Sequence, residues 1–220
     1  MVEAATEFRK SNFNEEDSAM LATISAMFQN VADSEISAGE SAGFLISQMI
    51  AFGIEADNAV SIIDAVNKVS NEYAVSSSDL ASALGVVASS SSAMGNNLNE
   101  TIGLVTAITE QTRNANTAAR GTNSIMASLA SVLDENSSKG KTVAKIFENV
   151  GVSMYDANGQ LLSGFDLLSG LAGKWEGLDE NTQKYIATTI AGEILPLQGE
   201  YAGTCLEPYI LNCSRNVTMA

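Results

Sequence analysis

The sequence predicts an all-α protein, and two observations support this prediction. Along most of the chain, apolar residues recur every three or four positions, which places them on one face of a helix. Ser, Asn or Asp precedes many of these apolar stripes, where its side chain can cap a helix, and Gly follows several of them, where a helix can end. Because the connections are short, we expect a multi-helix array of antiparallel helical hairpins.

Three helices are predicted up to Tyr73. The first begins at Glu15, and its apolar face comprises Met20, Leu21, Ile24, Phe28 and Val31. Ser37 and Glu40 have the spacing of a capping box for the second, which ends at Gly53 and buries Leu45, Met49 and Phe52. The third stripe comprises Val60, Ile63, Val66, Val69 and Tyr73.

Two further cap signals begin the next helices. Ser76 and Asp79 precede a helix that buries Leu80, Leu84 and Val87. After Gly95, Asn97 and Glu100 begin a helix that carries Ile102, Val105 and Ile108. We expect the stretch "TAARGTNS" (residues 117–124) to break this helix, after which the pattern continues with Ile125, Leu129, Val132 and Leu133.

The stretch that follows interrupts the helical pattern with a turn. A short helix with Val143, Ile146, Phe147 and Val150 stops at Gly151. Residues 152–155 and 160–162 then flank "DANG", and because Asn-Gly favours tight hairpin turns we predict one small β-hairpin-like turn near residues 152–162. Ser163 with Asp166 caps the next helix, with Leu167, Leu168, Leu171 and Trp175, and the last runs from Asp179 through Tyr185, Ile186 and Ile190 to Gly192.

The charge of the chain argues against nucleic acid and anionic membranes as partners. The chain has 26 acidic and 11 basic residues, a formal net charge of -15, so phosphate groups are repelled overall. The start of the sequence lacks the pattern of a secretory signal, and the most apolar window, residues 42–54, is too short to span a bilayer. We therefore expect no direct nucleic-acid binding and no membrane span.

No motif predicts catalysis, a cofactor or a metal. The chain has no histidine, which removes the commonest general base and transition-metal ligand. "SSKGKT" (residues 137–142) ends like a phosphate-binding loop, but Glu135 stands where its first glycine belongs, so we expect a polar helix connection with two exposed lysines. "DANGQ" begins like a calcium loop but has Leu161 and Leu167 at the sixth and twelfth places, so we expect a plain turn. Carboxylates are numerous, but no pair stands out.

The order of these segments resembles the core region of phage tail tape-measure proteins. The resemblance covers about residues 3–192 and is carried by "S-x-x-D-L-A-x-A" at residues 76–83, the Asn/Glu-capped helix after Gly95, and "G-V-x-x-x-D-x-x-G" at residues 151–159. A leucine-rich helix and a terminal Ala-Gly at residues 191–192 complete the order. Residues 1–192 are therefore expected to form a helical, tape-measure core-like domain.

The resemblance implies a structural role in a phage or prophage tail. Tape-measure proteins set tail length, occupy the tail tube during assembly and leave it ahead of the DNA. The expected partners are the tail tube protein, the tail-tip proteins and tail-assembly chaperones, in a homo-oligomer, trimeric or hexameric. The expected location is the tail lumen of the virion, and the host cytoplasm during assembly. Even one continuous helix of 220 residues would reach only about 330 Å, so we expect the ruler to lie elsewhere in a longer chain.

The sequence departs from the family after Gly192. Both prolines and both cysteines of the chain lie there, and no periodicity continues. We expect residues 193–220 to be a divergent, poorly packed tail, from a frameshift or truncation artefact; a genuine divergent strand or loop is the alternative.

Two other functions stay open at this stage. One is a bacterial helical effector or interaction protein, secreted without a signal peptide, because acidic, Ala/Ser-rich and His-free chains occur among such proteins. The other is a carboxylate-dependent hydrolase, which the lack of a paired motif disfavours.

Overall fold

The computed structural model describes residues 2–32 and 36–192, which form ten α-helices and two short 3-10 helices. In chain order these are α1 (Val2–Lys10), α2 (Glu15–Val31), α3 (Ala38–Phe52), η1 (Ala56–Asn58), α4 (Val60–Glu72), α5 (Ser77–Ala93), α6 (Leu98–Thr112), α7 (Ala115–Ala130), η2 (Ser131–Leu133), α8 (Ser138–Val150), α9 (Gly164–Trp175) and α10 (Glu180–Ala191). The prediction of an all-α protein is thus confirmed for the described residues. That consecutive helices run antiparallel stays a prediction.

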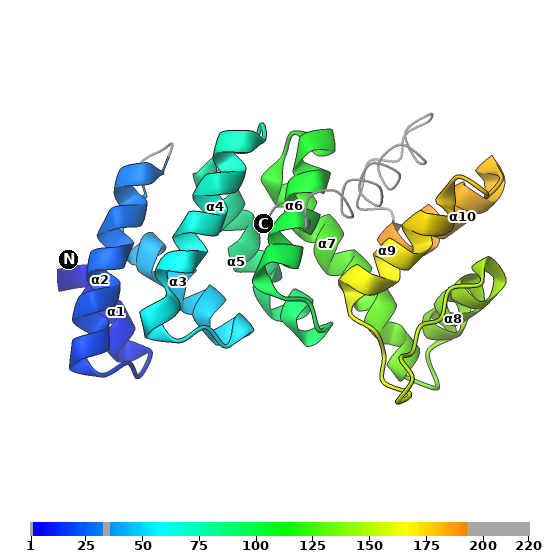
Figure 1. Cartoon of the computed structure of the whole chain (residues 1–220), viewed down its shortest axis with the longest axis horizontal. Coiled ribbons are helices and arrows are strands. Elements are labelled where there is room, and N and C mark those ends of the chain that lie inside the picture. Colours follow the sequence, from blue (N-terminus) through cyan, green and yellow to red (C-terminus); the bar gives the residue numbers. More distant parts are fainter. Residues whose placement is uncertain (1, 33–35, 193–220) are drawn as a thin grey trace.

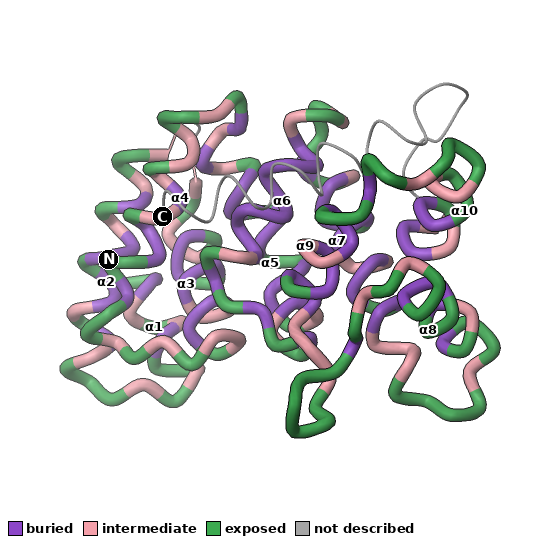
Figure 2. Tube along the Cα trace, turned by 45° about the vertical axis from the view of Figure 1, so that its right-hand side comes forward, coloured by how far each residue is buried: buried purple, intermediate pink, exposed green. Residues whose placement is uncertain are grey.

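The helices form an elongated array (Figure 1). Helices α1 and α2 lie at one end, and α8 and α10 lie at the other. Helix α5 lies between them and packs against α3, α4, α6 and α7, while α7 also contacts α8 and α10. The buried positions follow the inner sides of the helices along the whole array (Figure 2). The largest fully buried side chains are Trp175, Phe8, Phe28 and Phe147.

The predicted cap residues begin and end the helices as expected. Ser37 with Glu40 and Asn97 with Glu100 form complete capping boxes, in which each side chain bonds to the other residue's backbone N–H. The Ser76, Ser163 and Asp179 side chains accept from backbone N–H groups of the first turns of α5, α9 and α10. Left-handed glycines end α3 (Gly53) and α8 (Gly151), because a residue without Cβ adopts positive φ at little cost.

The predicted break at residues 117–124 is wrong. These residues lie inside α7, and the chain breaks earlier, at Arg113, which is in the left-handed region at φ 52°. The Asn114 side chain then caps α7 by accepting from Thr117 N–H. Gly121 and Thr122 do not interrupt the helix, because both are buried and the Thr122 hydroxyl donates to the Ala118 carbonyl one turn back.

The predicted turn near residues 152–162 contains less β-structure than a hairpin. Tyr155 and Leu161 form an isolated antiparallel bridge, and no strand occurs in residues 2–32 and 36–192. The flanking segments are too short to extend the bridge, because Ser163 already caps α9.

The first helix, α1, was not predicted from the sequence, although Ala4 and Phe8 are buried one turn apart on it.

Some predicted apolar stripes are only partly buried. Val31, Val60, Leu133 and Tyr185 are 42%, 37%, 66% and 55% exposed. All but Val60 lie on elements at the two ends of the array, where no further described element covers them. The predicted tail, residues 193–220, lies outside the described residues, so the division of the chain at residue 192 stays a prediction.

A buried amide joins two parts of the chain that are far apart in sequence. The Asn96 side chain, 4% exposed, accepts from Phe165 N–H at 2.8 Å and donates to Ser91 Oγ at 2.9 Å. Beside it, Gly164 N–H donates to the Met94 carbonyl at 3.0 Å. The connection between α5 and α6 therefore supplies acceptors to N–H groups at the start of α9, which have no partner within that helix.

We expect Asn96→Ala to lower the free energy of unfolding by about 1–3 kcal/mol, because it leaves the buried Phe165 N–H without its acceptor. Urea denaturation followed by circular dichroism measures this change. Asn99→Ala, which removes an exposed amide three residues further along, is the matched control, with an expected change below about 0.5 kcal/mol. Equal effects of the two substitutions would contradict the role given to Asn96.

Candidate interaction surfaces

The "SSKGKT" segment was expected to be a helix connection, but it forms the cap and first turn of α8. Ser137 caps the helix by accepting from Gly140 N–H at 3.0 Å, and Lys139 and Lys141 are both exposed, as expected. A Cβ at Gly140 would lie 2.1 Å from the Ser131 carbonyl oxygen. The glycine is therefore explained by the close packing of α8 on η2.

The "DANGQ" segment is a turn whose carboxylate is used by its own backbone. Asp156 Oδ1 accepts from Asn158 N–H and Gln160 N–H, both at 2.8 Å, and Gly159 has φ 77°. These bonds lower the pKa of the Asp156 carboxyl, with the Gln160 N–H as the largest cause. Among the described residues, no group of three His, Cys, Asp or Glu side chains is placed to hold a metal ion.

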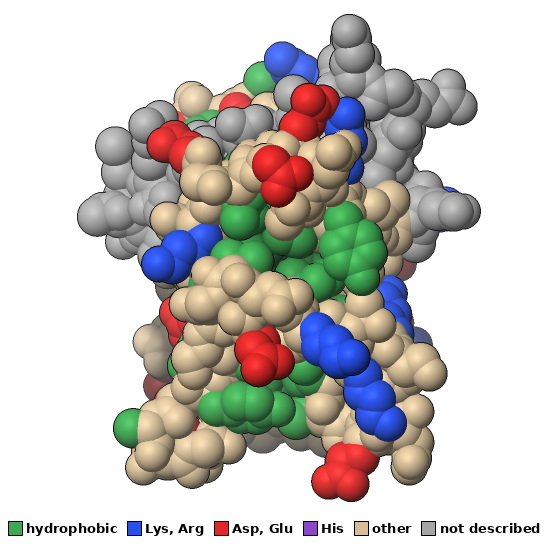
Figure 3. Space-filling model, turned by 90° about the vertical axis from the view of Figure 1, so that its right-hand side faces the viewer, with side chains coloured by type: hydrophobic (Ala, Val, Ile, Leu, Met, Phe, Trp, Pro, Cys, Tyr) green, Lys and Arg blue, Asp and Glu red, His purple; other side chains and the backbone are tan. Residues whose placement is uncertain are grey.

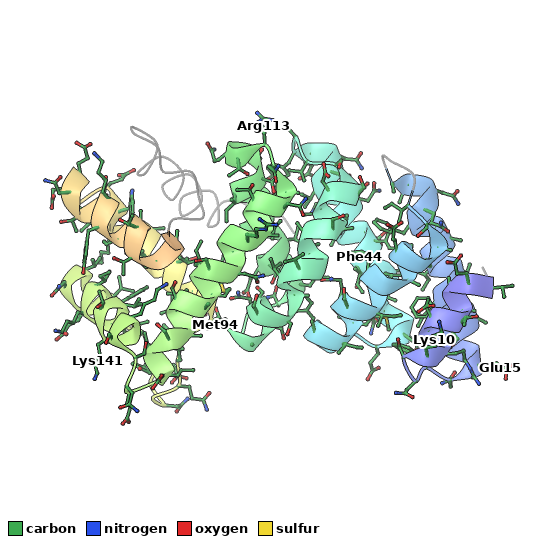
Figure 4. All side chains as sticks on the ribbon, turned by 180° about the vertical axis from the view of Figure 1, so that it is seen from behind. Lys10, Glu15, Phe44, Met94, Arg113 and Lys141 are labelled. Atoms are coloured by element: carbon green, nitrogen blue, oxygen red, sulfur yellow. The ribbon has the colours of Figure 1, made fainter. Side chains whose placement is uncertain are left out.

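A groove of about 350 Å³ runs between α3 and α5. Small residues form its walls, with Gly43 and Ser47 one turn apart on α3 and Ser78, Ala81, Ser82 and Gly85 on α5. Phe28, Ile36, Glu40 and Phe44 also line it, and the ring centroids of Phe28 and Phe44 lie 5.2 Å apart (Phe44 is labelled in Figure 4). A Cβ at Gly43 or Gly85 would meet no atom within 4 Å, so the groove is open above both glycines.

A second hollow of about 460 Å³ lies where α3 and α4 meet the start of α6. Its lining mixes apolar and polar side chains: Phe52, Ile54, Ser61, Asp64, Ala65, Lys68, Asn97, Leu98 and Asn99. Each lining includes serine hydroxyls and a carboxylate, Glu40 in the first hollow and Asp64 in the second. Ser47 and Ser61 donate to the backbone carbonyls of Phe44 and Asn58, and Glu40 accepts from Ser37 N–H. Sequence analysis missed both, although small residues spaced three or four apart on α3 and α5 were a signal for the first.

None of the helices formed by residues 2–32 and 36–192 has the length and apolar character needed to cross a bilayer.

We expect Gly140→Ala to destabilise the protein by about 1–3 kcal/mol, because the added methyl group collides with the Ser131 backbone. Thermal unfolding followed by circular dichroism tests this expectation. Gly173→Ala in α9 is the matched control, since a Cβ there meets nothing within 4 Å, and it should stabilise the helix by up to about 1 kcal/mol. A neutral Gly140→Ala would show that α8 and η2 can separate freely.

Comparison with known proteins now identifies the family. Residues 1–192 match the family described as phage-related minor tail protein. The tape measure protein of Pneumococcus phage Dp-1 is 27% identical over 152 residues, which cover 68% of this chain and 12% of that protein. The chain thus spans a small part of that relative's length, and no solved structure matches it significantly. The resemblance to tape-measure proteins is confirmed, and the chain belongs to the phage-related minor tail protein family.

Proposed function

We propose that this chain is a folded module of a phage tail tape-measure protein, and that it acts by contact with other tail proteins and not by catalysis. The proposal rests on the match of residues 1–192 to the tail family. It also rests on the similarity to a tape measure protein, of whose length the matched part makes up 12%. The module belongs to the tail lumen of the virion, and to the host cytoplasm during assembly. Membership of this family favours the tail over a secreted effector.

The geometry of the helices supports a docking module more than a ruler. The longest helices, α2 and α5, have 17 residues each, which is about 26 Å at 1.5 Å per residue. The helices of the array pack side by side and do not join end to end (Figure 1). A segment folded in this way adds little to the length of a protein, so the part that sets tail length lies elsewhere in the longer chain.

The partners we propose are the tail tube protein, the tail-tip proteins and tail-assembly chaperones, with the module present in three or six copies. The groove between α3 and α5 supports this proposal, because small side chains allow another helix to approach the backbone closely. The excess of acidic residues also supports it, because an acidic surface does not adhere to DNA in the same lumen.

The proposal predicts that duplicating the module does not lengthen the tail. In the phage or prophage that encodes the chain, an in-frame duplication of residues 1–192 should leave tail length unchanged in electron micrographs. If the segment instead lay extended as one helix, the duplication would add about 290 Å.

An in-frame deletion of the same residues provides the complementary measurement. It should prevent normal tail assembly, and a complementing single copy should restore it. Normal tails without the segment would refute a structural role, whereas a lengthened tail after duplication would refute only the distinction between module and ruler.

A further inference from the structure

The turn between α8 and α9 contains the one Asn-Gly pair of the chain, Asn158–Gly159. Figure 3 faces the α8–α10 end of the array and shows hydrophobic side chains gathered at its centre, with charged and other polar side chains around them. The chain between α8 and α9 passes along the lower edge of the array (Figure 1), and residues 155–160 are all exposed. The Asn-Gly pair is therefore open to water, and asparagine is among the chemically labile residues.

The reaction open to such a pair is deamidation, which consumes only water. The backbone nitrogen of Gly159 bonds to Cγ of Asn158, the Cγ–Nδ2 bond breaks, and ammonia leaves with the proton of the Gly159 N–H. Water then opens the resulting five-membered succinimide at either carbonyl, which yields aspartate or its backbone-extended isomer, isoaspartate. Glycine favours the ring closure because it has no Cβ to hinder its nitrogen.

The folded turn holds the reacting atoms away from this geometry. Gly159 N–H donates to the Asp156 carbonyl at 3.1 Å, and neither Ala157 nor Asn158 has positive φ, so residues 156–159 form a type I turn. The third residue of such a turn has ψ of about 0°, which places its Cβ roughly a third of a turn about the Cα–C bond from the next nitrogen. The succinimide ring needs these two atoms eclipsed, so the turn must open before the ring can close.

Asp156 is the residue that keeps the turn closed. Its Oδ1 accepts from Asn158 N–H and Gln160 N–H, both at 2.8 Å, and its Oδ2 accepts from Asn158 Nδ2 at 3.4 Å. The Asp156 N–H donates to the Gln160 carbonyl at 2.9 Å. The side-chain amide that would be lost as ammonia is therefore bonded to the same carboxylate that fixes the backbone on both sides of it.

We propose that Asn158–Gly159 is a latent deamidation site, which the Asp156 turn holds unreactive in the folded protein and which reacts when the turn opens. The product replaces the Nδ2 donor with an oxygen that repels the Asp156 carboxylate. Isoaspartate also adds a methylene group to the backbone that these hydrogen bonds span, so an isoaspartate chain does not rebuild the same turn. Deamidation thus permanently marks a chain whose turn has been open.

The chain contains a matched control in the turn that precedes α8. Asn136 N–H donates to Asp134 Oδ1 and Ser137 N–H donates to the Asp134 carbonyl, both at 2.9 Å, as in the Asp156 turn. The residue after Asn136 is serine, whose Cβ hinders attack by its own nitrogen. Asn136 should therefore deamidate slowly whether its turn is closed or open.

Deamidation of the full chain is measured by peptide mass spectrometry, from the mass gained when NH2 is replaced by OH. Native buffer is compared with guanidinium chloride at the same pH and temperature. Unfolding should speed the conversion of Asn158 at least roughly tenfold, because the closed turn no longer protects it, and Asn136 should remain much slower. Equal rates at Asn158 in the two solutions would overturn the proposal. An unfolded chain in which Asn158 reacts no faster than Asn136 would overturn it as well.

Two substitutions of Asp156 test its role in the folded protein. In native buffer, Asp156→Ala should speed the conversion of Asn158 severalfold while circular dichroism shows unchanged helicity. Asp156→Asn keeps an acceptor oxygen for the Asn158 and Gln160 N–H groups and should preserve the protection. A folded Asp156→Ala protein that converts at the unmodified rate would overturn the role of Asp156. If Asp156→Ala unfolds the protein, the comparison of the two solutions still decides whether the folded chain protects the site.

This inference does not depend on the role in the tail, and its failure would leave the family and the proposed function untouched.

Discussion

The position of α9 depends on one buried amide, that of Asn96. This residue lies in the α5–α6 connection, and its side chain accepts from Phe165 N–H across 69 residues of sequence. Its donor group is bonded to Ser91 Oγ, which is itself within 2.7 Å of Thr101 Oγ1 on α6. The amide is therefore held in place from both α5 and α6, and it fixes where α9 begins. Buried polar groups are costly when unpaired. This network therefore allows few alternative positions for the turn before Ser163 and for the helix after it.

The rest of the core is assembled mainly from small residues packed at close range. Aromatic residues make up 6% of the chain, so few large side chains separate the helices. Buried hydroxyls fit such close contacts because backbone carbonyls within reach accept from them. Thr109 donates to the Val105 carbonyl of its own helix, and Ser41 donates to the Ser25 carbonyl of the neighbouring helix. Gly140 is the extreme case, because the backbones of Gly140 and Ser131 lie too close together to leave room for a methyl group between them. Specificity in this core comes from how closely the backbones can approach each other.

Local signals predicted the helices well, and long-range contacts account for what could not be predicted. Ser37, Asn97 and Asp179 cap helices because each needs only the backbone N–H groups two or three residues ahead. The break assigned to residues 117–124 failed because Gly121 and Thr122 look like loop residues in isolation but are buried in the array. Likewise, apolar periodicity showed which face of a helix is apolar but not whether another element covers it, as the exposure of Leu133 and Tyr185 demonstrates. The groove between α3 and α5 depends on how two helices are placed, which no single stripe specifies.

The neighbour-to-neighbour packing of the array has a mechanical consequence. Most helices contact those close to them in sequence, and no cysteine occurs before residue 205, so no covalent cross-link ties the helices of residues 2–192 together. Tension applied between the two ends would load the interfaces one after another and not all at once. Under tension, such a protein is expected to unravel helix by helix and not in a single step.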